Sequence, residues 1–318
     1  MDINIEQAAA YLKDRDDYLV VSHASPDADT IGSAAALVTG LRSIGKNAVA
    51  VCYDRIPDKL SFLDSGCCFT ETEPKGIKTY ISVDTASAVM LGGLAEKYTK
   101  ERVFDLAIDH HIVNNIPCRQ RLLFADYSSC GEIIFELLEK LGIPLDKSTA
   151  TSLYGAMSSD SGGFRFSSTR PQTMRHAARL METGIDFAKI NRLLFETKTL
   201  RQIEIERIAY NSVELYYDGR LAVVTITADH LLKANADESD IEGLSQIPRQ
   251  ISGVEVSAVI RPKGDTVKVS LRSNDYFNVA ELASRFGGGG HHHAAGCSFD
   301  TDTDHAKEAI IDSLKGLL

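Results

Sequence analysis

The sequence of 318 residues lacks the long apolar segment that a membrane-spanning helix requires. No apolar run approaches the roughly 18 residues that would cross a bilayer, and residues 1–6 have neither the basic nor the apolar character of a signal peptide. The six cysteines form no C-x-x-C pair, so we expect reduced thiols. Together these absences predict a cytoplasmic protein without a membrane segment.

An excess of positive charge is also absent. The 34 Lys and Arg residues are outnumbered by 44 Asp and Glu residues, which gives a net charge of −10. Proteins that follow long nucleic acids neutralise many phosphates and are usually basic. Any nucleic-acid substrate is therefore expected to be short and held by a few local contacts. Carboxylates that bind divalent cations would account for part of the acidity.

The pattern of apolar residues predicts two α/β domains, and the length is sufficient for two separate cores. Apolar runs at 18–23, 48–53, 80–84 and 103–109 alternate with helical patterns such as 31–44 and 88–98. This alternation favours a parallel sheet covered on both faces. Helical patterns follow at 130–141, 147–159, 171–182 and 187–211.

The last third of the sequence is richer in β-type residues. Strands are predicted at 220–228, 254–261 and 266–272, with a hairpin turn at 263–265, and helices at 279–286 and 305–317. We therefore expect an N-terminal parallel-sheet α/β domain over 1–190, a helical linker over 191–212 and a smaller C-terminal α/β domain over 213–318.

Polar side chains follow the predicted strands where each strand ends. They are His23, Asp27 and Asp29 after the first strand, Asp84 after the third, Asp109, His110 and His111 at the end of the fourth, and Asp160 at a helix end. Ligands collect at the carboxyl ends of parallel strands. Taken singly, an aspartate there is more often a helix cap or a turn residue, and Asp27 and Asp29 could cap the next helix. Their coincidence at one edge of the sheet favours a metal site.

The donor atoms indicate which metals such a site would bind. Carboxylate oxygen and imidazole nitrogen without thiolate suit Mn²⁺, Mg²⁺ or Fe²⁺. So many carboxylates would repel one another strongly around a single ion. Two divalent ions would remove this repulsion.

These motifs resemble those of a known superfamily. The run H-x-x-x-D-x-D at 23–29, Val83-Asp84, Asp109-His110-His111 and Asp160 are similar to the four motifs of the DHH phosphoesterases. The tract at 289–296 is similar to the G-G-H-x-x-A-[AS]-G signature of the DHH-associated C-terminal domain. The resemblance spans residues 23–296, and the most similar subgroup is the nanoRNase type of oligoribonuclease and pAp phosphatase.

The resemblance implies two Mn²⁺ ions and a role for each ligand. One ion would be held by His23, Asp27 and Asp84, and the other by Asp29, Asp84, His110 and Asp160. His111 would face the scissile phosphate, and Asp109 would orient the histidines. The ions would activate water and stabilise charge on the phosphate.

The resemblance also implies an active site in the cleft between the domains, with the C-terminal domain binding substrate. The residues expected to do so are Arg272, Ser273, Gly289, Gly290 and His291, with Arg165 as a weaker candidate. Glycine leaves backbone N–H groups accessible to a phosphate, and arginine can bind one through two hydrogen bonds. Without the resemblance, Arg272 could equally be an exposed charge at a strand end. His292 and His293 match no position of the signature.

The predicted function is Mn²⁺-dependent hydrolysis of short RNA oligonucleotides, including pApA, to mononucleotides and of the 3'-phosphate of pAp. Cyclic dinucleotides are a further substrate class, and a homodimer is compatible with the resemblance. The alternatives are a family II inorganic pyrophosphatase, a RecJ-like single-strand exonuclease and a non-catalytic nucleotide or metal sensor. The pyrophosphatase is disfavoured because its Ser-Arg-Lys-Lys-Gln stretch is missing, and the sensor because every ligand position holds a competent residue. The preferred substrate, the polarity of attack and the physiological metal stay open.

Overall fold

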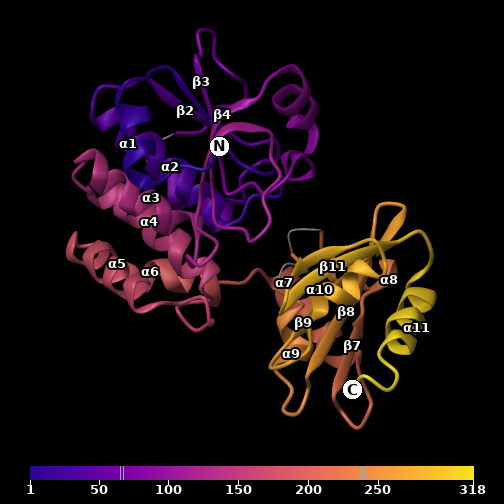
Figure 1. Ribbon diagram of the computed structural model, residues 1–318. Coiled ribbons are helices and arrows are strands. Elements are labelled where there is room, and N and C mark those ends of the chain that lie inside the picture. Colours follow the sequence, from indigo (N-terminus) through magenta and orange to yellow (C-terminus); the bar gives the residue numbers. More distant parts are fainter. Residues whose placement is uncertain (65, 67, 238–239, 242) are drawn as a thin grey trace. The chain divides into compact units, whose positions relative to one another are not determined.

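The computed structural model describes residues 1–64, 66, 68–237, 240–241 and 243–318 (Figure 1). The chain divides into two compact units, Met1–Thr197 and Lys198–Leu318. The boundary falls within the range 191–212 that was predicted as a linker. Helix α7 (Leu200–Asn211) belongs to the second unit, where Ile205 and Ala209 are fully buried.

The first unit contains a parallel sheet of 5 strands in the order β2-β1-β3-β4-β5. The strands are β1 (Tyr18–Val21), β2 (Ala48–Val51), β3 (Thr79–Val83), β4 (Phe104–Asp109) and β5 (Cys118–Leu123). The predicted parallel α/β sheet is thus confirmed. The edge strand β5 was not predicted, because its central residues are Arg119, Gln120 and Arg121 and form no apolar run.

Helices and helical turns cover both faces of this sheet. The α-helices are α1 (Ile5–Lys13), α2 (Ala28–Ser43), α3 (Cys130–Leu141), α4 (Lys147–Asp160), α5 (Pro171–Glu182) and α6 (Phe187–Asn191). The 3₁₀ and π turns are η1 (Asp58–Asp64), η2 (Ala88–Leu94), η3 (Lys97–Glu101) and η4 (Arg192–Glu196). Leu37, Ile133 and Leu153 belong to the larger core on one face. On the other face Leu91 and Tyr98 join a smaller core.

Two predicted helices are wrong in their continuity. The segment 88–98 is interrupted at Gly92, whose φ of 56° is not helical, so it forms a 3₁₀ turn followed by a π turn. The segment 187–211 is interrupted before Thr199, whose side chain caps α7 by accepting a hydrogen bond from the Gln202 amide. In both places a cap or a glycine overrides the apolar periodicity.

The second unit contains a sheet of 6 strands in the order β10-β11-β9-β8-β7-β6, in which only β7 and β8 run parallel. Its strands are β6 (Val213–Tyr216), β7 (Leu221–Thr225), β8 (Val256–Lys263), β9 (Thr266–Ser273), β10 (Gly289–His291) and β11 (Ala294–Phe299). Besides α7 its helices are α8 (Ala228–Ala234), α9 (Gln246–Arg249), α10 (Val279–Ser284) and α11 (Thr303–Ser313). Leu282 and Ile310 pack on one core, and Ile205 and Ile247 pack on another. The second α/β region was therefore predicted correctly, although β6, β10 and β11 were not.

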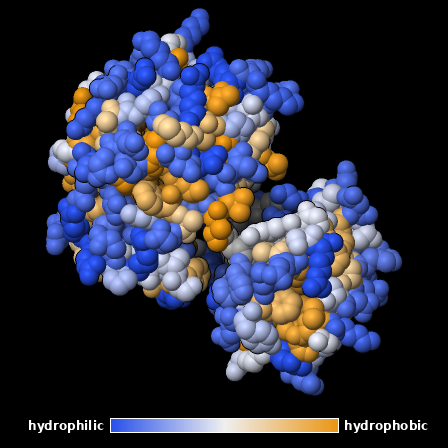
Figure 2. All heavy atoms as spheres, viewed as in Figure 1, coloured by the Kyte–Doolittle hydropathy of each residue, from blue (hydrophilic) through white to orange (hydrophobic). Residues whose placement is uncertain are grey.

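The surface agrees with the composition. Figure 2 shows mostly hydrophilic residues on the visible face of each unit, with hydrophobic residues in small groups between them. No helix in the described ranges is long and apolar enough to span a bilayer. The five cysteines whose positions are described are free thiols.

Candidate metal centre

Three loops at the carboxyl edge of the parallel sheet bring the predicted ligands together. His23 follows β1, Asp84 follows β3 directly, and His110 follows β4 directly. The start of α2 adds Asp27 and Asp29, and the end of α4 adds Asp160. Because all strands run in one direction, their ends meet at this edge.

The two aspartates of the first loop have different environments. Asp27 caps α2, since its Oδ1 accepts a hydrogen bond from the Thr30 amide at 2.9 Å, and its side chain is 52% exposed. Asp29 is fully buried and accepts hydrogen bonds from the amides of Cys130 and Gly131 at 2.7 and 2.9 Å. Only Asp27 therefore acts as the helix cap that both residues could have been.

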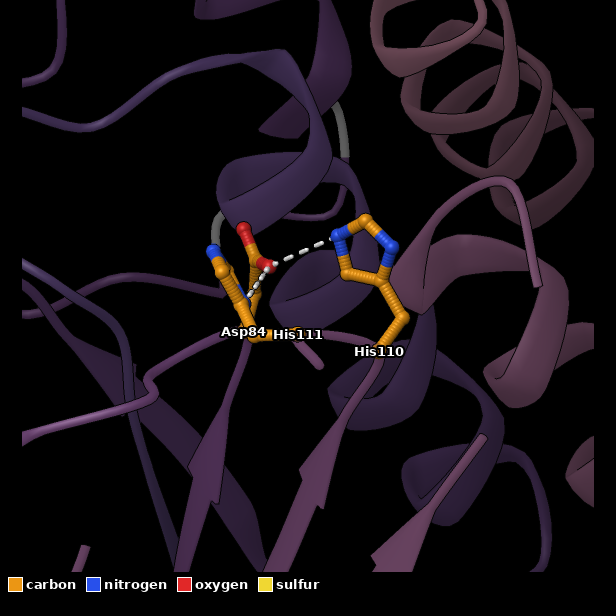
Figure 3. A group of neighbouring side chains, drawn as sticks. All are labelled: Asp84, His110 and His111. Atoms are coloured by element: carbon orange, nitrogen blue, oxygen red, sulfur yellow. Dashed lines mark ion pairs between the residues drawn. The ribbon is translucent and has the colours of Figure 1, made fainter. Parts of the chain in front are cut away.

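Asp84 lies at the centre of the group. It is 2% exposed, and its φ of 51° places it in the left-handed region, which aspartate tolerates better than most residues. Its oxygens lie 3.5 Å from His23 Nε2, 3.6 Å from His110 Nε2 and 3.8 Å from His111 Nδ1. Figure 3 shows the last two of these pairs. Nevertheless, the buried Oδ1 of Asp84 has no hydrogen-bond partner among the described residues.

Three overlapping sets of side chains offer ligand atoms within 4.8 Å of one another. They are His23–Asp27–Asp84, Asp29–His110–Asp160 and Asp84–His110–His111. Asp84 and His110 each belong to two sets. All six predicted metal ligands thus lie in one connected group.

The charges of this group are poorly compensated by the protein itself. Burial, together with the charges of Asp29 and Asp27, raises the pKa of Asp84 well above its ordinary value. Burial and the charge of Asp160 raise the pKa of Asp29 to about 8. Burial alone would lower the pKa of His110, but the Asp160 hydrogen bond and the nearby carboxylates raise it well above its ordinary value. Divalent cations in place of protons would satisfy both the charges and the unpaired Asp84 oxygen, so the donor set fits metal ions.

The second ring nitrogen of each histidine has its own partner. His23 Nδ1 lies 2.6 Å from the Ala24 carbonyl oxygen, and His110 Nδ1 lies 3.3 Å from that of Tyr127. These contacts favour the tautomer that leaves Nε2 unprotonated for a metal.

His111 has a carboxylate partner instead. Its Nδ1 lies 2.7 Å from Asp109 Oδ1, and Asp109 Oδ2 accepts a hydrogen bond from Asn114 at 2.6 Å. Although burial alone would raise the pKa of Asp109, the hydrogen bond with His111 lowers it. Sequence reasoning missed Asn114, since an asparagine in a loop carries no signal of this role.

The second unit contains a cavity of about 550 Å³ beside the glycine tract. Its polar side chains are Lys268, Ser270, Arg272 and Ser298, and it is also lined by Phe286, Gly287–Gly290 and Ala294–Cys297. The lining includes no carboxylate. Among the described residues, Arg272 forms no ion pair, and its guanidinium donates to the Leu271 carbonyl at 2.9 Å. Burial and the nearby Arg249 lower the pKa of Arg272, so an anion would be favourable here.

Of the other predicted substrate residues, two glycines line this cavity and Ser273 does not. Gly289 and Gly290 line the cavity, and a Cβ on Gly290 would lie 2.4 Å from the Ala294 carbonyl oxygen. Ser273 is 1% exposed and does not line the cavity, and its hydroxyl lies 2.9 Å from His293 Nδ1. The side chain of His291 lies outside the described part of the structure.

Arg165 is exposed in the turn after α4, and its guanidinium lies 5.9 Å from the ring centre of Phe195. Lys268 was not predicted, although its spacing of four residues from Arg272 on one strand places both side chains on one face.

The fold and the site together define a class of α/β proteins in which carboxylate and imidazole groups at the carboxyl edge of a parallel sheet could hold metal ions. Family comparison agrees with this class: residues 17–157 match the N-terminal domain of the DHH family, and residues 218–318 match the DHHA1 domain. The chain therefore belongs to the DHH phosphoesterases, with both domains present.

The chain is similar to named relatives over almost its whole length. It is 28% identical to the bifunctional oligoribonuclease and PAP phosphatase NrnA of Thermus thermophilus, covering 93% of this chain and 88% of the relative. It is 24% identical to the protein of the same name from Mycoplasma genitalium, covering 99% and 98%. The crystal structure of an exopolyphosphatase-related protein from Bacteroides fragilis has a TM-score of 0.89, with 25% identity, 98% coverage of this chain and 95% of that one.

Proposed function

We propose that this protein hydrolyses short RNA oligonucleotides, including pApA, to mononucleotides and removes the 3'-phosphate of pAp, using two divalent ions of which Mn²⁺ is the expected metal. The observation that carries this proposal is the sharing of Asp84 and His110 between sets of metal ligands. The names of the relatives from Thermus and Mycoplasma support the substrate class. Cyclic dinucleotides are a further proposed substrate.

Two of the three ligand sets are each assigned one ion, and Asp84 is added to the second of them. His23, Asp27 and Asp84 would hold one, and Asp29, Asp84, His110 and Asp160 would hold the other, with Asp84 contacting both. When bound, the ions lower the pKa of water and stabilise negative charge on the phosphate. The unpaired Oδ1 of Asp84 is the atom that supports a bridging role.

His111 is proposed to act on the substrate rather than on a metal. Its Nδ1 lies 2.7 Å from Asp109 Oδ1, and this contact fixes the orientation in which the ring would meet a phosphate oxygen. The lowered pKa of Asp109 keeps this carboxylate ionised, so it holds the His111 ring in one orientation. Asp109 is therefore a positioning residue.

The cavity of the second unit is proposed to bind the terminal group of the nucleotide. Arg272, Lys268 and the amides of Gly289 and Gly290 would receive a phosphate, with His291 at the end of the same tract. Arg165 is a further candidate for a phosphate contact in the first unit. The buried hydroxyl of Ser273 is used by His293 and is left out of this proposal.

Substrate assays with Mn²⁺, and with EDTA as the metal-free control, test the activity. Inorganic phosphate release from pAp and mononucleotide formation from pApA are expected, with pyrophosphate left intact. Cleavage of pyrophosphate alone would instead favour a family II pyrophosphatase. Tight nucleotide or metal binding with no turnover of any substrate would favour a sensor.

Substitutions in the cavity test the recognition proposal. Arg272→Ala and His291→Ala should each reduce kcat/KM for pAp and pApA roughly 5- to 150-fold. This corresponds to a loss of about 1–3 kcal/mol of transition-state stabilisation. Arg220→Ala is the control, because this arginine belongs to the same unit but does not line the cavity. A small activated phosphodiester should be hydrolysed equally well by all variants. An equal loss for the small substrate would assign Arg272 and His291 to the metal centre or the fold.

A further inference from the structure

The loop between β5 and α3 supports the Asp29–His110–Asp160 set and not the His23–Asp27–Asp84 set. The Tyr127 carbonyl oxygen contacts His110 Nδ1 at 3.3 Å, and the first amides of α3, those of Cys130 and Gly131, bind Asp29. His23 is instead supported by the Ala24 carbonyl oxygen, and Asp27 by the Thr30 amide. Residues 124–131 thus position Asp29 and His110 but neither His23 nor Asp27.

A buried glutamate fixes this loop from inside. Glu132 is 0% exposed, and its Oε2 accepts hydrogen bonds from the Ser128 amide at 3.0 Å and the Ser128 hydroxyl at 2.9 Å. The Thr173 hydroxyl of α5 lies 3.0 Å from the same oxygen. The carboxylate of Glu132 therefore connects the loop to a helix that supplies no metal ligand.

An arginine from the start of α5 holds the loop from outside. Arg170 Nη1 lies 2.6 Å from Asp126 Oδ2, and Nη2 lies 3.3 Å from Glu132 Oε1. Its guanidinium carbon lies 4.0 Å from the ring centre of Tyr127, at cation–π distance. Arg170 and Glu132 together contact Asp126, Tyr127 and Ser128, three successive residues of the loop.

We infer that Arg170 and Glu132 are positioning residues for the ion of the Asp29–His110–Asp160 set, and that they set its affinity without contacting any ligand side chain. Loss of the Arg170 contacts frees the Tyr127 carbonyl and the start of α3, so His110 and Asp29 lose their fixed orientations. The ion of the His23–Asp27–Asp84 set is unaffected. This inference rests on the proposed function, in which two ions bind.

A second arginine provides a matched control for a purely structural role. Arg179, on the same helix, pairs with Glu139 of α3, and its guanidinium carbon lies 5.2 Å from the ring centre of Phe135. These interactions also join α5 to α3 and also include an aromatic ring. However, Glu139 lies in the last turn of α3, away from the loop that supports the ligands.

The experiment titrates Mn²⁺ into metal-free full-length protein and measures free Mn²⁺ by electron paramagnetic resonance. The wild-type protein is expected to bind two ions. Arg170→Met should bind one ion with wild-type affinity. It should bind the other at least about tenfold more weakly, as expected for the loss of contacts behind a metal ligand. Arg179→Met should bind both ions like the wild-type protein. Asp126→Asn removes one partner of Arg170 at a side chain that is 71% exposed, so it should weaken the same ion by a few-fold without impairing folding.

Several results would overturn the inference. They are unchanged binding of both ions by Arg170→Met and Asp126→Asn, equal weakening of both ions, or the same loss in Arg179→Met. Wild-type protein that binds fewer than two ions would overturn the dinuclear proposal itself. The two failures are therefore distinguishable from the wild-type titration alone.

Discussion

At the scale of single residues, Asp84 combines features that a protein rarely tolerates without a ligand. Its carboxylate is buried, one oxygen lacks a hydrogen-bond partner, and its backbone is in the left-handed region. Each feature costs stability, and strain of this kind concentrates at functional sites. The imidazoles of His23 and His110 lie beside it in the described part of the chain, but they are shared with other carboxylates.

The substitution Asp84→Asn should lower kcat by about a thousandfold or more, which corresponds to roughly 4 kcal/mol of transition-state stabilisation. An amide oxygen cannot bridge two cations as a carboxylate does, so bound Mn²⁺ should fall as well. Asp17→Asn is the control, since Asp17 also has a positive φ, of 55°, but precedes β1 at the opposite edge of the sheet. Steady-state kinetics and metal analysis check the prediction. Two bound ions and near-normal turnover in Asp84→Asn would contradict it.

The sequence was sufficient to find the candidate ligands but not the groups behind them. His23, Asp84 and His110 follow apolar runs, and such runs predict strands whose ends meet at one edge. Backbone groups such as the Tyr127 carbonyl have no residue-type signal, because every residue has one. Asn114 lies in a loop whose course depends on tertiary packing. These supporting contacts could therefore be found only from the structure.

At the scale of elements, the start of α3 acts as a binding group for Asp29. Ser129 caps the helix by accepting a hydrogen bond from the Glu132 amide, and the amides of Cys130 and Gly131 remain for the Asp29 carboxylate. The partial positive charge of a helix N-terminus favours this arrangement. Gly131 permits the start of α3 to approach α4 closely, since a Cβ there would lie 2.5 Å from the Ala156 Cβ of α4.

The substitution Gly131→Ala should displace the start of α3 from α4 and Asp29. We expect a loss of about 1–3 kcal/mol in the free energy of unfolding, together with weaker Mn²⁺ binding. Gly142→Ala, at the other end of α3, is the control. Its φ of 75° makes alanine unfavourable for the backbone, but the added Cβ would contact no neighbouring atom within 4 Å. That variant should lose about 1–2 kcal/mol and keep its metal affinity. Urea unfolding and Mn²⁺ titration distinguish the two. Normal Mn²⁺ affinity in a destabilised Gly131→Ala protein would show that the α3 amides do not set the position of Asp29.

The contacts of Glu132 predict a dependence of stability on pH. Burial alone would raise the pKa of Glu132, but His176 Nδ1 at 3.3 Å, the hydrogen bonds from Ser128 and the charge of Arg170 lower it from 4.5 to about 2. A pKa that is lower in the folded state contributes stability above the unfolded value, and this stability is lost as the pH falls from about 4.5 to 2. Glu132→Gln should therefore destabilise the metal-free protein most at pH 6–7, and its difference from the wild type should shrink toward pH 3. Urea unfolding at several pH values checks this, and a difference that stays constant with pH would contradict it.

The elements themselves were predictable to the extent that burial leaves a periodic pattern. β1 and β3 are buried throughout, β4 is buried at every position except Asp105, and all three appear as apolar runs, whereas the polar edge strand β5 has no such pattern. The short strand β10 consists of Gly289, Gly290 and His291, and its pairing with β11 depends on close backbone approach rather than on side-chain type. Propensity and periodicity do not report such pairing.

At the scale of the whole molecule, the charges limit how much nucleic acid the protein can hold. The net charge is −10, and the cavity beside the glycine tract contributes Lys268 and Arg272 as its only cationic side chains. A cavity of about 550 Å³ is of the size that holds one small-molecule ligand. Each phosphate beyond the first few would therefore lie on an acidic surface and gain little attraction.

This distribution of charge predicts a preference for short substrates. Binding energy should come from one terminal group in the cavity and one phosphate at the metal ligands, so kcat/KM should be highest for RNA of about 2–4 nucleotides and at least tenfold lower at about 20 nucleotides. The measurement is a series of end-labelled RNAs of increasing length at fixed Mn²⁺ and salt, resolved on a sequencing gel. Lowering the salt concentration should not rescue the long substrates, because the surface outside the cavity repels them. Processive degradation of a 20-mer as fast as a dinucleotide would contradict this argument and would favour an exonuclease of the RecJ type.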